Sequence, residues 1–91
     1  MNDRTKQDNA LAHLPNVGRV LHGHLTAIGI RTPEELRALG AKEVFQRIRK
    51  LDPGACLHML YGIQGSIEGM SDKMLSQDTK EELKVFFRSL S

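Results

Sequence analysis

Apolar residues recur along this chain with helical spacing, three or four positions apart, and Gly, Pro or Ser interrupts the pattern every ten to fifteen residues. No stretch alternates apolar and polar residues in the way that marks a half-buried strand. The pattern therefore predicts an all-α fold, a compact single domain of five or six short helices.

The interruptions set the expected bounds of the helices. A residue such as Gly29 ends a helix because glycine takes a left-handed conformation without a steric clash. The sequence TPEE begins one, with Thr32 as N-cap, Pro33 in the first turn and Glu35 completing a capping box. Ser76 is the expected N-cap of the last helix. We expect helices over residues 6–13, 19–28, 33–39, 41–51, 55–70 and 77–90.

The apolar positions also predict which faces turn inward. In the second helix and just before it these are Val17, Val20, Leu21, Leu25 and Ile28. In the fourth helix they are Val44, Phe45, Ile48 and Leu51. In the fifth, Cys56 belongs to an apolar stripe that adjoins a stripe of small residues, among them Gly62, Gly65 and Gly69. Since each glycine inside a helix costs about 1 kcal/mol relative to alanine, we expect a neighbouring helix backbone to pack closely against this stripe.

Charge and cysteine content narrow the setting of the domain. The net charge is +2, milder than that of a protein that coats nucleic acid, and the single Cys56 cannot form an internal disulfide. Residues 1–10 form a polar arm without the apolar stretch of a signal peptide, and no apolar run approaches the ~18–20 residues of a membrane span. We therefore expect a helical domain over residues 11–90, a cytoplasmic location and no membrane partner.

The chain offers little for catalysis. Cys56 falls on the predicted buried stripe, and the histidines have no Cys or carboxylate partner at the spacing of zinc ligands. The carboxylates are scattered over helix starts and surface positions, and the GxxxxGK pattern of a phosphate-binding loop does not occur. We expect no enzymatic activity, no metal and no cofactor.

The sequence LPNVG at residues 14–18 carries the main functional prediction. It forms a tight turn before a helix, where backbone N–H groups and the helix dipole favour an anion such as a DNA phosphate. Residues 14–52 hold seven Lys and Arg against four acids, which places any anion-facing surface in this part. The alternative is an ordinary elbow between helices, with basic residues that only complement a helix dipole. The predicted contacts are Asn16, Val17, Gly18 and Arg19, with Arg47, Arg49 and Lys50 as a second contact.

Several of these features occur together, in the same order, in a known family. The turns LPNVG and AIGI, the helix start TPEELRALG and the segment GACLHMLYG make residues 11–90 resemble the C-terminal domain of the TfoX (Sxy) family of bacterial competence regulators. The first part also resembles a helix-hairpin-helix element, whose turn commonly reads PGIG. The resemblance implies a small helical domain related to helix-hairpin-helix or SAM-like folds.

Together with the turn, the resemblance implies a regulatory function in transcription of DNA-uptake genes, alongside the cyclic-AMP receptor protein, with weak and non-specific binding of double-stranded DNA. The alternative is a protein-interaction module that uses Leu57 and Tyr61, on the expected outer face of the fifth helix, to form a homodimer or to bind a transcription factor.

The chain departs from the family pattern in three ways. Asn16 replaces the first glycine of the hairpin turn. One hairpin is present where DNA-binding versions usually work in pairs, which implies weak affinity or a dimer. The N-terminal domain of the family does not precede the motif, so we expect either a stand-alone relative or a separated half of a two-domain protein.

Overall fold

The computed structural model describes residues 10–90. Residues 10–12 are helical. They are followed by α2 (Arg19–Ala27), α3 (Pro33–Leu39), α4 (Ala41–Leu51), α5 (Leu57–Glu68), the short 3₁₀ helix η1 (Asp72–Met74) and α6 (Gln77–Ser89). No residue between 10 and 90 belongs to a strand, so the all-α prediction is confirmed for this part. The earlier part of the expected first helix and residues 1–9 of the predicted arm lie outside the described residues.

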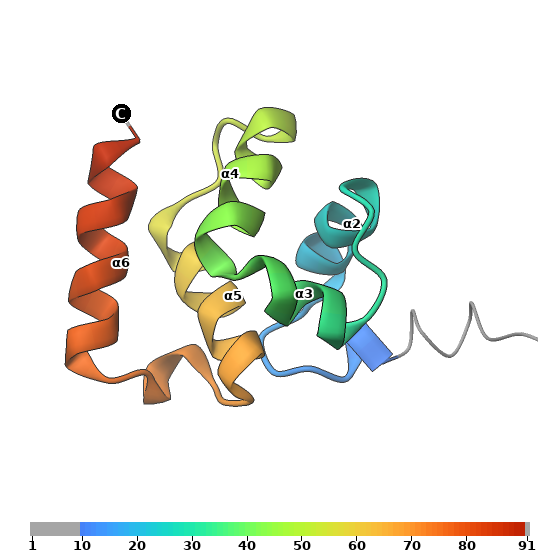
Figure 1. The fold of residues 1–91 in the computed structure, drawn as a ribbon, viewed down its shortest axis with the longest axis horizontal. Helices are drawn as coiled ribbons and strands as arrows, with labels where there is room; N and C mark the ends of the chain where they lie inside the picture. The colour runs from blue at the N-terminus through green and yellow to red at the C-terminus, as the bar shows by residue number, and fades with distance from the viewer. Residues whose placement is uncertain (1–9, 91) are drawn as a thin grey trace, which may run out of the picture.

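Helix α5 lies at the centre of the domain, with α6 on one side and α4, α3 and α2 on the other (Figure 1). The buried apolar residues come from every helix around it, and they include Leu25, Leu36, Val44, Phe45, Ile48, Leu60, Ile63 and Leu83. None of the helices in the described part is both long and apolar enough to cross a membrane.

The two predicted helix caps, Thr32 and Ser76, are confirmed. The Thr32 hydroxyl accepts a hydrogen bond from the Glu35 N–H at 3.1 Å, and the Glu35 carboxylate accepts one from the Thr32 N–H at 3.2 Å. Ser76 caps α6 in the same manner by accepting a hydrogen bond from the Thr79 N–H at 3.1 Å. These bonds form because the first N–H groups of a helix have no partner within it.

Thr32→Ala removes one half of the capping box. We expect it to lower the free energy of unfolding by about 1 kcal/mol, because an N–H at the start of α3 loses its acceptor. Urea denaturation followed by circular dichroism measures this loss. Thr26→Ala is the control, since the Thr26 hydroxyl donates to the His22 carbonyl within α2 and caps no helix start. An equal loss in both variants would contradict the prediction.

Three predicted core positions are wrong. Val20, Leu51 and Cys56 are exposed, Val20 to 66% and Leu51 to 55%. Val17 precedes α2, so the spacing between Val17 and Val20 does not place them on one helix face. The buried face of α2 contains Leu21 and Leu25, and Val20 lies outside it. Leu51 is the last residue of α4. Cys56 is the extended N-cap of α5, with φ −110° and ψ 172°, so helical spacing does not orient it.

Candidate nucleic-acid interface

The turn at residues 14–18 packs against the small-residue stripe of α5. A Cβ atom on Gly65 would lie 2.5 Å from Asn16 Nδ2, 2.7 Å from the Met70 carbonyl oxygen and 3.2 Å from the Asp72 nitrogen. A Cβ on Gly62 would lie 3.6 Å from the Asn16 Cβ. The stripe does allow a close approach, as predicted, but the neighbour is this turn and the segment leading into η1 rather than the backbone of another helix.

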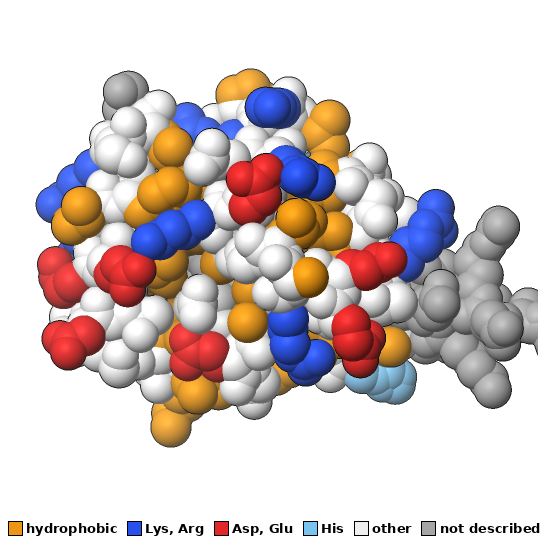
Figure 2. Space-filling view, viewed as in Figure 1, with side chains coloured by type: hydrophobic (Ala, Val, Ile, Leu, Met, Phe, Trp, Pro, Cys, Tyr) orange, Lys and Arg blue, Asp and Glu red, His pale blue; other side chains and the backbone are white. Residues whose placement is uncertain are grey.

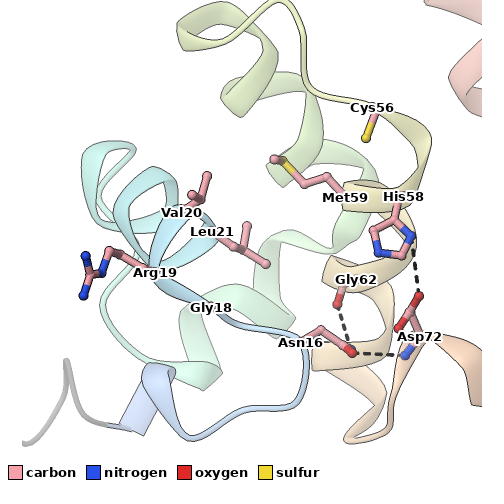
Figure 3. Close-up of a pocket in the computed structure, with 10 residues that line it drawn as sticks. All are labelled: Asn16, Gly18, Arg19, Val20, Leu21, Cys56, His58, Met59, Gly62 and Asp72. Atoms are coloured by element: carbon pink, nitrogen blue, oxygen red, sulfur yellow. Dashed lines mark hydrogen bonds and ion pairs between the residues drawn. The ribbon is translucent and has the colours of Figure 1, made fainter.

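Asn16 links the turn to two other segments. It has the left-handed φ of 68° that its place in a tight turn predicts. Its amide nitrogen donates to the carbonyl oxygens of Gly62 at 3.2 Å and Met70 at 2.9 Å, and its amide oxygen accepts from the Asp72 N–H at 3.1 Å. Two of these bonds are drawn in Figure 3. Both side-chain amide hydrogens are therefore used within the protein, where they hold the turn in place.

Hydrogen bonds from other residues fix the rest of the turn. The buried Ser66 hydroxyl of α5 lies 2.5 Å from the Pro15 carbonyl oxygen, to which it donates. Within the turn, the Val17 N–H bonds to the Leu14 carbonyl at 3.3 Å and the Gly18 N–H to the Asn16 carbonyl at 3.2 Å. Two of the predicted phosphate donors, the N–H groups of Val17 and Gly18, are thus already engaged.

The start of α2 is the part of the predicted site that stays open. Gly18 is its N-cap, with φ −90° and ψ −172°, and no side chain caps the helix there. A Cβ on Gly18 would have no other atom within 4 Å. The next residue, Arg19, is exposed. The N–H groups of the first turn of α2 have no partner within the helix, so they and the Arg19 guanidinium together can hold an anion.

Two of the three basic residues predicted on α4 are engaged elsewhere. Arg47 forms an ion pair with Glu43, with Nε 2.9 Å from Oε2. The Arg49 guanidinium lies over the rings of Phe45 and Phe87, 6.0 Å and 5.6 Å from their centroids, where it joins α4 to α6. The charge of Arg47 is therefore partly neutralised by Glu43, and the Arg49 guanidinium is partly occupied by the two rings.

The basic end of α4 and the turn do not form one site. Lys50 is exposed near that end, but the C-terminal end of α4 and the turn at residues 14–18 lie at opposite ends of the molecule in Figure 1. On the face shown in Figure 2, positive and negative side chains are interspersed rather than gathered into a continuous basic surface. A contact through Lys50 would thus be separate from one at the turn.

The face of α5 that was predicted to be outermost is partly covered. Leu57 and Tyr61 are half-buried and pack against the core, and the Tyr61 hydroxyl donates to the Lys80 carbonyl of α6 at 3.4 Å. The periodicity of α5 could not indicate this, because it does not say on which side a later helix will pack. These two side chains are therefore less exposed than predicted.

A cleft of about 560 Å³ lies between α2 and the first half of α5 (Figure 3). The residues that line it include Arg19, Val20, Leu21, His58, Met59 and Asp72. The sequence does not predict this cleft, because its walls come from three separate stretches of the chain. The one sequence feature that could have indicated the cleft is Val20, an apolar residue at the edge of the apolar face of α2.

The fold and the turn define a small helical domain with an open helix start held in place by a central helix. The chain belongs to the TfoX C-terminal domain family, whose model matches residues 7–87. It is 31% identical over 81 residues to Protein Sxy of Escherichia coli (strain K12). The match covers 89% of this chain and 39% of Sxy, so the chain spans about two fifths of the length of that relative.

Two crystal structures from Listeria monocytogenes have the same fold. One is of an uncharacterized protein in a triclinic form, with 42% identity and a TM-score of 0.86 over 88% of this chain and 91% of that one. The other is of a protein of unknown function in a tetragonal form, also with 42% identity and a TM-score of 0.86, over 89% and 99% of the two chains. The arrangement of helices described above is therefore shared with experimentally determined relatives.

Proposed function

We propose that this chain is a non-catalytic regulatory domain of the competence-regulator type that acts in transcription by binding the DNA backbone weakly and without sequence preference. The observation that carries the proposal is the open start of α2, where an uncapped helix begins at Gly18 beside the exposed Arg19. Membership of the TfoX C-terminal domain family supports the regulatory part.

The geometry of the turn favours a phosphate over other ligands. The N-terminus of a helix carries partial positive charge and outward-facing N–H donors, which suit a phosphate oxygen. Gly18 has no side chain to keep a DNA strand at a distance. The hydrogen bonds of Asn16 and Ser66, and the close approach at Gly65, fix the turn against α5. The donors are those of the first turn of α2 together with the Arg19 side chain, a narrower set than the sequence predicts.

Weak and non-specific binding follows from the small number of contacts. A phosphate contact carries no base information, and each one neutralised contributes a slope of about −0.9 to the dependence of log affinity on log salt. With a net charge of +2 and one uncapped helix start beside an exposed arginine in the proposed contact, one or two phosphates per domain are expected.

Arg19→Ala should weaken DNA binding for all sequences alike and reduce the salt slope by about 1. The measurement is a fluorescence-anisotropy titration of a labelled non-specific duplex at about 50 and 200 mM salt, the range over which phosphate contacts are most evident. Arg37→Ala is the matched control, because Arg37 is an exposed arginine that belongs to α3 and not to the turn or to α2.

Gly18→Val provides a second, uncharged test of the same contact. The extended backbone of Gly18 suits any residue and its surroundings are empty, so the fold should persist with a stability loss below about 1 kcal/mol, while DNA binding is lost. The proposal is refuted if the wild-type chain does not bind the labelled duplex at low salt. Equal weakening by Arg19→Ala and Arg37→Ala would do the same.

A further inference from the structure

The cleft between α2 and α5 presents apolar side chains to solvent beside the proposed DNA contact. Val20 is 66% exposed, and Leu21 and Met59 also line the cleft. In Figure 3, Val20 and Leu21 point from α2 toward Met59, whereas the Arg19 side chain points away from the cleft. The cleft and the proposed DNA contact therefore share the start of α2, whereas the Arg19 side chain lies outside the cleft and the Val20 side chain within it.

A helix begins at each of the two ends of the cleft. α2 begins at one end and α5 at the other (Figure 3), and neither helix start has a side-chain cap. The partial positive charge of each helix N-terminus is thus left without a side chain to balance it. Asp72 is the one acidic residue among those that line the cleft, and its carboxylate lies 3.7 Å from Nδ1 of His58.

We propose that this cleft is a docking groove for a peptide segment of a protein partner, in which two neighbouring apolar side chains are flanked by Asp or Glu. The apolar pair covers Val20 and Met59 and displaces the water that now contacts them. The acidic side chains lie at the two helix starts, which gives charge complementarity at both ends. Met59 suits this use because its flexible thioether adapts to anchors of different shape.

Other occupants fit this surface less well. Residues 1–9 of the chain, MNDRTKQDN, contain Met1 as their one apolar residue, so they cannot supply two neighbouring anchors. The other large apolar residues exposed on the described surface, Leu51, Met74 and Val85, stand on three different elements, so a second copy offers no such pair outside its own cleft. A DNA strand would place its phosphates against apolar side chains, where they lose water without compensation.

Selection from a phage-displayed library of random peptides against the full chain tests the proposal. Val20→Gln is the counter-target, because it replaces the exposed apolar side chain without a change of charge and keeps a good helix former. Val85→Gln is the matched control, since Val85 is 63% exposed but lies on α6, outside the cleft. Circular dichroism verifies that both variants remain folded.

The selected peptides should share an apolar pair flanked by acids. A synthetic copy should bind Val20→Gln about tenfold more weakly than wild type, and Val85→Gln as tightly as wild type. The proposal is overturned if no peptide is enriched on the wild type relative to Val20→Gln, or if the enriched peptides share no acidic residues. It is also overturned if the synthetic peptide binds Val20→Gln as tightly as the wild type.

The DNA titration separates this proposal from the proposed function. The Arg19→Ala variant should bind the peptide like the wild type, because the Arg19 side chain that it loses points away from the cleft. Val20→Gln should bind the duplex like wild type. If Val20→Gln weakens duplex binding as much as Arg19→Ala does, the cleft belongs to the DNA contact and the docking groove is refuted, whatever becomes of the DNA proposal.

Discussion

Gly65→Ala is expected to lower the free energy of unfolding by about 3 kcal/mol, which corresponds to a fall in Tm of roughly 12 °C or more. The new methyl group would lie 2.5 Å from Asn16 Nδ2 and 2.7 Å from the Met70 carbonyl oxygen, too close for any real Cβ contact. The first neighbour is a side chain of the turn and the second is backbone of the segment before η1, so both segments must move away from α5. The hydrogen bonds of Asn16 then lengthen or break.

Gly23→Ala is the control for this substitution, and it should have the opposite sign. Gly23 lies inside α2, and a Cβ there would have no other atom within 4 Å. Alanine should therefore stabilise the domain by about 0.5–1 kcal/mol through helix propensity alone. Urea denaturation of both variants measures the difference. If Gly65→Ala were also stabilising, the turn would not pack against α5 as described.

Asn16→Asp is expected to have the second largest effect, a loss of about 2–3 kcal/mol. The substitution keeps the size of the side chain and tolerates the left-handed backbone. It replaces the donor nitrogen with a charged oxygen that faces the carbonyl oxygens of Gly62 and Met70. Two hydrogen bonds are lost and a repulsion takes their place.

Asn16→Gly distinguishes the side-chain bonds from the backbone strain. Glycine accepts the φ of 68° even more readily than asparagine, so any loss in this variant reflects the missing amide. Denaturation in urea at neutral pH should place Asn16→Gly between the wild type and Asn16→Asp. Wild-type stability in both variants would show that the amide does not hold the turn.

The parts of the fold that the sequence predicts well are those determined by neighbouring residues. Thr32 and Glu35 bond to each other across three positions, and Ser76 to Thr79 across the same distance. The left-handed conformation of Asn16 is also a local property of a Pro, Asn and Gly turn. For such features the residue type and its spacing contain the physical cause, so no knowledge of the rest of the chain is needed.

The features that escaped prediction depend on contacts between distant segments. The glycines of α5 indicated a close approach, but only the folded chain shows that Asn16 makes it. Tyr61 was expected on the outside, and α6 packs there because its own apolar face, with Leu83, needs a partner. The sequence predicts that a helix begins after Gly18, but it does not predict that the Asn16 side-chain amide donates to carbonyl groups elsewhere in the fold.

The hydrogen bonds that join the turn to α5 and to the segment before η1 also determine when the turn can form. They connect residues 46 to 56 positions apart. Helices such as α2 and α4 form from local contacts within microseconds, whereas closing a loop of this length has an entropic cost that local contacts do not offset. On the ribosome, α2 therefore emerges long before Asp72, the last residue that the turn needs. The open helix start gains its fixed orientation only after Asp72 has emerged, so a shorter nascent chain contains the α2 residues without the ability to present this start.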